Sequence, residues 1–294
     1  MTSAIRVLPE RQAGTLLASY QAAARGKRQR VIVGLAVLAG LTLLAGWMAE
    51  VRLGTFADNI GNFTNYLAQI LPQLTWSNLR GDLAGWYWNL PKWLALLGET
   101  ILIAYLGTVV GAIGAFLLCF AASANLVRSP WLRFAARRYL EFCRTVPEVV
   151  FALIFVLAFG LGPVVGVMAL AIHTTGALGK LFAEVAENID MKPVEGIEAT
   201  GASWVEIIRF AVLPQVLANF ASYALLRFEI NVRAAGVMGF VGAGGIGMEF
   251  LVAIRSFYYQ DISAILLLIV VTVIGIDLAT ERLRHLLMSA EARH

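Results

Sequence analysis

Gly242, Gly244 and Gly247 form a G-x-G-x-x-G pattern, the spacing with which dinucleotide-binding proteins hold a phosphate. Such a site also needs a β-strand before the glycines and an acidic residue about 20 positions after them. Asp261 stands near that distance, but residues 213–232 form a long apolar run and no short alternating strand. The glycines therefore do not predict a nucleotide site.

The sequence contains no other pattern of a catalytic site. It has no H-E-x-x-H and no G-x-S-x-G, which disfavours an intramembrane enzyme, and no G-x-x-x-x-G-K-[ST], so the chain does not bind ATP through a P-loop. Cys119 and Cys143 lie in or beside apolar runs, without a C-x-x-C or neighbouring histidines. We expect both thiols to pack as small apolar groups.

Polar residues interrupt the apolar segment 164–188. His173, Lys180, Glu184 and Glu187 lie on one face of the predicted helix. Thr174 and Thr175 stand next to His173. Charges within a membrane span usually face the bundle interior or a pathway. In the alternative interpretation, Lys180 and Glu184 neutralise each other at i,i+4 spacing, and His173 is a core residue whose hydrogen bonds are satisfied.

The apolar segment 213–232 ends in the sequence RFEINVR. Glu229 and Arg233 stand in the i,i+4 order that favours an ion pair, whereas Arg227 and Asn231 share another face. Since a guanidinium donates in a planar fork that fits an anion, Arg227 either contacts an anion or pins a neighbouring helix. The candidate pathway residues are His173, Thr174, Thr175, Arg227 and Asn231.

Composition indicates the setting of these residues. The chain has 294 residues, of which 59% are hydrophobic and only 14% charged, whereas soluble domains carry about 25% charged residues. Its apolar blocks approach the roughly 20 residues that a spanning helix needs, and they lack the alternation of a β-barrel strand. Basic residues cluster at the ends of these blocks, as topology signals do, so the net charge of +4 does not indicate nucleic acid.

We therefore predict an all-α integral membrane protein with six spans, Val31–Ala49, Leu94–Ala122, Phe142–Phe159, Val164–Asn188, Leu213–Val232 and Ile262–Thr280. A five-span alternative makes Val149–Ile172 one helix. Six spans leave most Lys and Arg on one side, which places both termini in the cytoplasm. Five spans would move the basic 192–209 region and the C-terminus outside.

The predicted organisation is a basic segment 1–30, an uncleaved anchor 31–49, an outer loop 50–93, a transmembrane domain 94–287 and a tail 288–294. The anchor is longer than the apolar core of a signal peptide. Residues Leu8–Arg30 either lie on the membrane as an amphipathic segment or form a disordered tail. The tryptophans of the outer loop suit an interfacial belt.

The loop 189–212 carries the most distinctive pattern. Its apolar residues fit one or two short amphipathic helices, interrupted at Gly201 and closed by Pro214. They are Ile197, Ala199, Trp204, Ile207 and Ile208. An exposed apolar face in the cytoplasm would imply a docking partner.

Glu195, Gly201, Ile207, Leu213 and Pro214 resemble the conserved loop of permease subunits in ATP-binding-cassette (ABC) importers. Gly196 and Ile197 depart mildly from that family, which usually has small residues after the glutamate. Two further stretches, GLGPVVGVMALAIHTTGALGKL and RFEINVRAAGVMGFVGAGGIG, resemble phosphonate importer permeases, so the resemblance covers residues 146–287. Similar glycine runs occur in methionine and osmoprotectant permeases.

The resemblance implies a type I permease fold with a methionine-permease-like core in the bacterial inner membrane. It implies that 189–212 is a coupling loop, with Glu195, Gly201, Ala202, Trp204, Ile207, Leu213 and Pro214 as its functional residues. Two partner ATPases would bind ATP and magnesium, a second permease copy would complete a homodimer, and a periplasmic binding protein would deliver the cargo. This chain would hold no cofactor and catalyse no reaction.

The implied function is translocation of phosphonate, or a related phosphorus oxyanion such as phosphite, by alternating access. The alternatives are an ABC permease for another small solute, such as methionine or an osmoprotectant, and an ion-coupled secondary transporter. In this setting we expect Gly242, Gly244, Gly245 and Gly247 to let a non-helical segment fold back into the outer half of the membrane as a gate. The alternative is an ordinary flexible outer loop.

Overall fold

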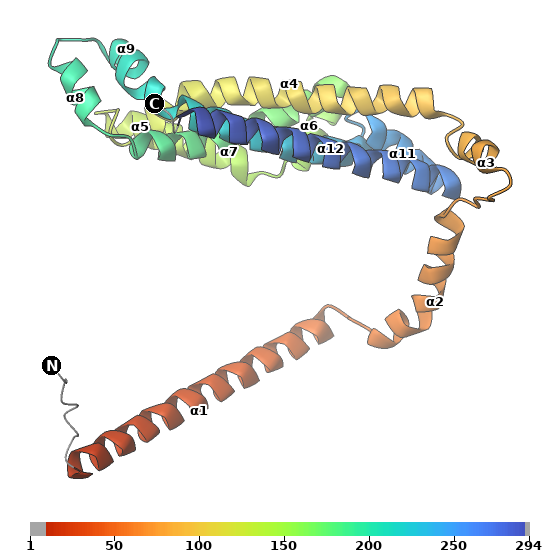
Figure 1. Ribbon diagram of the computed structural model, residues 1–294, viewed down its shortest axis with the longest axis horizontal. Coiled ribbons are helices and arrows are strands. Elements are labelled where there is room, and N and C mark those ends of the chain that lie inside the picture. Colours follow the sequence, from red (N-terminus) through yellow and green to blue (C-terminus); the bar gives the residue numbers. More distant parts are fainter. Residues whose placement is uncertain (1–9, 292–294) are drawn as a thin grey trace, which may run out of the picture. The chain divides into compact units, whose positions relative to one another are not determined.

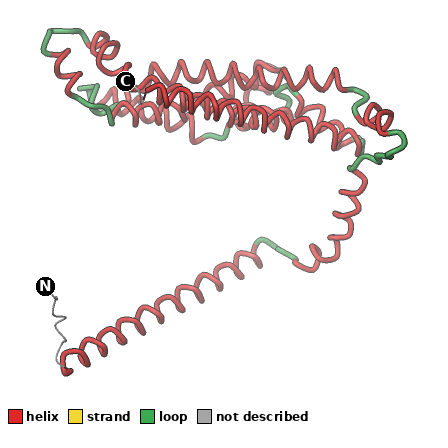
Figure 2. The backbone as a smooth tube through the Cα atoms, viewed as in Figure 1, coloured by secondary structure: helices red, strands yellow, loops and turns green. Residues whose placement is uncertain are grey.

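The computed structural model describes residues 10–291, and every regular element among them is helical (Figures 1 and 2). The elements are α1 (Glu10–Met48), α2 (Leu53–Ile70), α3 (Leu79–Trp86), α4 (Leu90–Ala122), α5 (Pro130–Thr145), α6 (Glu148–Phe159), α7 (Pro163–Glu187), α8 (Lys192–Glu198), α9 (Trp204–Ile207), the π-helix η1 (Ile208–Val212), α10 (Leu213–Met238), the 3₁₀-helix η2 (Gly239–Val241), α11 (Ile246–Arg255) and α12 (Tyr259–Glu291).

The chain divides into two compact units, one ending at Tyr66 and the other beginning at Leu67. In the first unit α1 is a single helix that crosses the predicted boundary between residues 30 and 31 without a break. One helix therefore joins the described part of the basic segment to the anchor. Residues 1–9 of the predicted segment lie outside the described residues.

In the second unit α4, α7, α10 and α12 lie lengthwise beside one another, with α8 and α9 at one end and α3 at the other (Figure 1). We call the end with α8 and α9 the loop end. α4 and α7 approach closely because α4 has Gly111 at the contact, where a Cβ would lie 2.6 Å from the Cβ of Thr174. Small residues at such contacts are typical of membrane helices, whose backbones must approach to gain packing energy.

Five helical segments among the described residues are long and apolar enough to cross a membrane, and a sixth is reached if the bent pair α5 and α6 counts as one span. The predicted third span, Phe142–Phe159, is not one helix: α5 and α6 meet at an angle of 85°. Pro147 causes this break, since proline disfavours a helical conformation in the residue before it, and Val146 is extended (φ −75°, ψ 123°).

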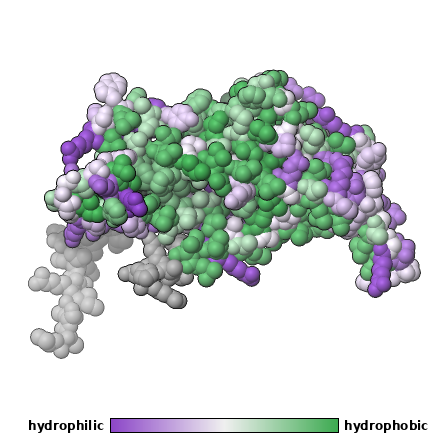
Figure 3. All heavy atoms as spheres, turned by 90° about the horizontal axis from the view of Figure 1, so that it is seen from above, coloured by the Kyte–Doolittle hydropathy of each residue, from purple (hydrophilic) through white to green (hydrophobic). Residues whose placement is uncertain are grey.

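The visible face of the molecule carries a broad apolar middle, with hydrophilic residues gathered towards the loop end and the opposite end (Figure 3). At the end opposite the loop end, the Trp86 indole N–H donates to the Gln260 carbonyl and the Ser263 hydroxyl. Trp93 is only 1% exposed, so it belongs to the core and not to the predicted interfacial belt, whereas Trp76 is 95% exposed.

Candidate functional site

The loop 189–212 folds into two short helices, α8 and α9, separated by a turn at Gly201, whose φ is +82°. Pro214 does not close this structure, because α9, η1 and α10 follow one another without a break. The π-helix explains why: the Leu213 N–H donates to the Ile208 carbonyl, five residues back, and Pro214, which has no N–H, falls in the first turn of α10.

The loop's predicted apolar residues form an exposed face only in part. Ile208 is buried, and Ile197 and Ile207 pack against a core cluster of the same chain, as does Leu213. Ala199 and Trp204 are exposed as predicted. The large exposed apolar side chains are Trp204 (47%), Val205 (66%) and Phe210 (60%). Any partner that docks on an apolar surface here would meet these three side chains, together with the exposed residues Glu195 and Gly201.

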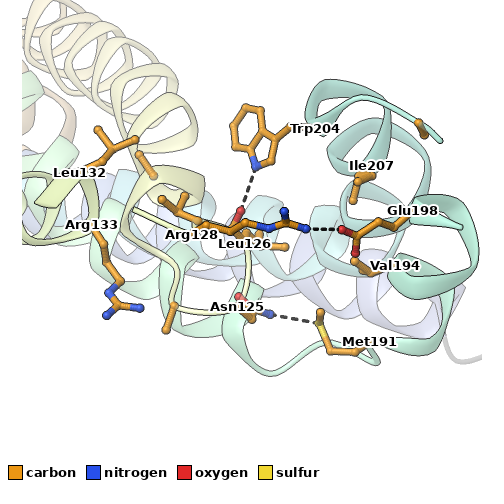
Figure 4. Close-up of a pocket in the computed structure, with 14 residues that line it drawn as sticks. Asn125, Leu126, Arg128, Leu132, Arg133, Met191, Val194, Glu198, Trp204 and Ile207 are labelled. Carbon is orange, nitrogen blue, oxygen red and sulfur yellow. Dashed lines mark hydrogen bonds and ion pairs between the residues drawn. The ribbon is translucent and has the colours of Figure 1, made fainter. Parts of the chain in front are cut away.

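Three contacts attach the loop to the α4–α5 connection, across a groove of about 890 Å³ that Ala202 also lines (Figure 4). The Trp204 indole N–H donates to the Leu126 carbonyl at 3.0 Å, and Arg128 pairs with Glu198 at 2.6 Å. The Asn125 amide nitrogen lies 3.5 Å from the Met191 sulfur. The loop is thus fixed at both α8 and α9.

The substitution Trp204→Phe tests this attachment. It keeps an aromatic ring but removes the donor to the Leu126 carbonyl, which should cost about 1 kcal/mol and raise local opening roughly fivefold. Hydrogen exchange of the 189–212 amides should quicken accordingly. Trp76→Phe, at a 95% exposed position, is the control, and equal exchange in both variants would contradict the attachment.

A buried polar network joins α4, α7 and α10. Asn231 is fully buried, and its amide nitrogen donates to the hydroxyls of Thr108 (2.8 Å) and Thr174 (2.9 Å). The Arg227 Nε donates to the same Thr174 hydroxyl at 3.4 Å. Arg227 and Asn231 therefore share a face as predicted, and that face points at α7.

His173 extends the network to α5 and α6. Its Nδ1 accepts from the Arg227 guanidinium Nη2, and its Nε2 lies 3.2 Å from the Arg144 carbonyl. These two contacts fit a neutral imidazole with its proton on Nε2. A Glu148 carboxylate oxygen lies 3.5 Å from Nδ1 and adds a counter-charge for Arg227. The sequence did not single out Glu148 or Thr108, because they lie on other helices than His173, Arg227 and Asn231 and only packing between helices brings them together.

The substitution Asn231→Ala should lower the free energy of unfolding by about 1–3 kcal/mol, because it deletes two buried hydrogen bonds and leaves the Thr108 hydroxyl without its donor. Denaturant unfolding of the purified protein, followed by tryptophan fluorescence, measures this. Asn65→Ala removes an exposed amide and is the control. A loss no larger than that of the control would mean that the network does not stabilise the bundle.

Thr175 and the remaining members of the predicted stripe on α7, Lys180, Glu184 and Glu187, do not form one cluster. The Thr175 hydroxyl donates to the carbonyls of Ala171 and Gly111, so it faces α4 and lies apart from Arg227. Lys180 and Glu184 pair at 3.2 Å, and both are about half exposed. Glu187 pairs with Arg137 of α5.

Glu229 and Arg233 are paired in the structure, and Arg233 also donates to Asp277 of α12 at 3.1 Å. Asp277 was not predicted, because it stands 44 residues further along the chain and only packing of α10 against α12 brings it here. The three residues form a second charged cluster, which we call the Glu229–Arg233–Asp277 triad.

The glycine segment after α10 is a buried, non-helical turn. Gly242, Gly244 and Gly245 have φ values of 90°, 84° and 78°, which disfavour other residue types. The Gly245 and Ile246 N–H groups donate to Glu99 and Thr100 of α4, and the Gly242 carbonyl accepts from the Gly162 N–H. These bonds to two neighbouring elements are inconsistent with an ordinary exposed loop.

A family model described as "Binding-protein-dependent transport system inner membrane component" matches residues 117–290, which include the 189–212 loop, both charged clusters and the glycine turn. The chain belongs to this family. The permease is therefore a multi-pass component of the inner membrane, a transport subunit that is not catalytic and carries no cofactor.

Two relatives and one solved structure show which transport proteins the permease is similar to. It is 35% identical over 243 residues to the phosphite transport system permease protein PtxC of Stutzerimonas stutzeri, covering 82% of this chain and 84% of that one. It is 39% identical over 190 residues to the phosphate-import permease protein PhnE of Mycolicibacterium smegmatis, covering 65% of this chain but 36% of that one. An inward-facing structure of the MetNI methionine ABC transporter superposes with a TM-score of 0.57 at 18% identity, covering 66% of this chain and 95% of that one. The fold is thus that of methionine-type ABC importer permeases.

Proposed function

We propose that this permease moves a phosphorus oxyanion, phosphonate or phosphite, across the bacterial inner membrane as the spanning subunit of an ABC importer. The similarity to PtxC, which extends over more than four fifths of both chains, carries the proposal. The resemblance of the stretches around His173 and Arg227 to phosphonate permeases agrees with it. Phosphate, for which the second relative is named, is the nearest competing cargo.

In this proposal both termini and the loop end lie in the cytoplasm, since most Lys and Arg fall on that side. Two ATPase subunits bind ATP and magnesium and dock on the 189–212 loop, and a second permease copy completes the pathway. A periplasmic protein delivers the oxyanion to the opposite end, where the glycine turn forms an outer gate.

The loop's attachments suggest how the ATPase moves the pathway. α9 continues through η1 into α10, which carries Arg227, Asn231 and Arg233 on the same rigid element. The Trp204–Leu126 bond and the Arg128–Glu198 pair connect the loop to the end of α4. A displacement of the loop would therefore move both α4 and α10, the helices that are joined by the hydrogen bond between Thr108 and Asn231. Such a coupled displacement exchanges inward-facing and outward-facing states.

The cargo is tested with the assembled complex in nanodiscs and its own binding protein. ATP hydrolysis should rise several-fold when the binding protein is loaded with phosphite or methylphosphonate, and much less with phosphate or methionine. Stimulation by methionine alone would overturn the assignment of cargo while leaving the ABC permease assignment intact.

A further inference from the structure

The two arginines of α10 occupy opposite environments. Arg227 is partly buried and donates to His173 and Thr174, with Glu148 nearby. The Arg233 side chain is 47% exposed and that of its partner Asp277 is 40% exposed, whereas Glu229 is 15% exposed. The accessible guanidinium is therefore that of Arg233, although the i,i+4 spacing had predicted that Arg233 is satisfied by its ion pair with Glu229.

The triad lies near the middle of the span bundle. Arg233 follows Asn231 by two residues, and Asn231 bonds Thr108 and Thr174, which are close to the midpoints of α4 and α7. A charged residue at the bilayer centre is energetically costly when it faces lipid. A half-exposed charged triad at this depth must therefore face water or another protein surface.

The triad leaves room for an anion. Glu229 and Asp277 both accept from the Arg233 Nη2, while its Nε and Nη1 make no hydrogen bond to any residue that the structure describes. A guanidinium has five N–H donors, so about three remain for a phosphoryl group, whose oxygens match the fork. Two carboxylates against one arginine keep such a site weak, and a weak site releases its ion.

We propose that the Glu229–Arg233–Asp277 triad lines the water-filled pathway and that Arg233 contacts the phosphorus oxyanion in transit. The part concerning the oxyanion rests on the proposed function. Asp277 is the more exposed carboxylate, and it yields its place on Arg233 to the passing oxyanion, while Glu229 keeps the side chain aligned. Arg227 is then a positioning residue that holds α10 against α7.

Thiol labelling tests whether the triad faces water. The native Cys119 and Cys143 are 0% and 1% exposed, so they contribute little background. Arg233→Cys and Asp277→Cys in the assembled complex are exposed to the cationic, water-soluble reagent 2-(trimethylammonium)ethyl methanethiosulfonate, because an anionic reagent would be repelled by the carboxylates that remain after Arg233 is replaced. The control is Val271→Cys on α12, which is 58% exposed but is not part of the triad.

We expect both triad cysteines to react at least tenfold faster than the control. Rates equal to the control would overturn the proposal, and a disulfide between two copies would instead assign the triad to the dimer contact.

Transport assays test the contact with cargo. Arg233→Gln should lower phosphite uptake per ATP hydrolysed about tenfold with the complex still assembled, and Arg233→Lys should restore part of it. Arg138→Gln, at an exposed ion pair of α5, is the matched control. Unchanged uptake in Arg233→Gln would overturn the contact. Absence of phosphite and phosphonate uptake by the wild type, with fast labelling at position 233, would instead refute the proposed cargo and leave the pathway assignment standing.

Discussion

Replacing Gly247 with alanine should prevent α11 from packing against α10 and remove most of the folded protein. A Cβ at this position would lie 1.9 Å from the Gly236 carbonyl oxygen, and the Gly239 Cα is also only 3.1 Å away. Both obstacles are backbone atoms, which cannot rotate away as a side chain can. Overpacking typically costs 1–3 kcal/mol, and a backbone clash of this kind should exceed about 3 kcal/mol.

The yield of monodisperse protein after detergent extraction measures this effect. Gly98→Ala is the matched control, since it places the same methyl group on a spanning helix with no atom within 4 Å. Alanine has the higher helix propensity, so the control should fold at least as well as the wild type. Gly247 lies in α11 and not, as predicted, in the non-helical segment. Equal yields for Gly247→Ala and Gly98→Ala would therefore mean that the close packing of α11 against α10 is wrongly described.

Gly201→Arg should leave the permease in the membrane but reduce ATP-driven uptake by more than tenfold. Gly201 is exposed, and no atom lies within 4 Å of the position of a Cβ, so an arginine meets no obstacle within its own chain. Its φ of +82° disfavours any side chain by about 1–2 kcal/mol, which the fixed loop can absorb. The larger effect is the bulk and charge presented to the docked ATPase.

Gly201→Ala separates the two effects, because it carries the backbone strain without the bulk. We expect it to retain most of the uptake, and Glu195→Arg, on the same exposed surface, to resemble Gly201→Arg. The readouts are uptake and ATP hydrolysis stimulated by loaded binding protein. Hydrolysis that remains coupled in both arginine variants would remove the 189–212 loop from the coupling mechanism.

Much of the architecture could be predicted because hydropathy alone decides it. Blocks of apolar residues near spanning length predicted helices, and α4, α7, α10 and α12 lie where those blocks stand. The bend at Pro147 was missed, although the proline and the flanking polar residues Arg144, Thr145 and Glu148 were local signals of a break. Pro214 misled in the opposite direction, since the first turn of a helix tolerates a residue that lacks an N–H and α10 follows η1 without a break.

The partners of the charged side chains could be predicted only where they lie on one helix. Glu229 and Arg233, and Lys180 and Glu184, followed from i,i+4 spacing. Asp277 and Glu148 reach their partners through packing between helices, which periodicity within one segment does not encode. The orientation of the loop was predicted only in part for the same reason: Trp204 is half exposed as expected, but Ile197 and Ile207 pack against their own chain.

The most direct test of an ATP-driven permease is uptake into proteoliposomes that contain this chain, its ATPase and its binding protein. We predict that radiolabelled phosphite accumulates with ATP and magnesium on the ATPase side, without any ion gradient, and that no accumulation occurs with the permease alone. Uptake by the permease alone under a proton or sodium gradient would contradict the account and identify an ion-coupled secondary transporter.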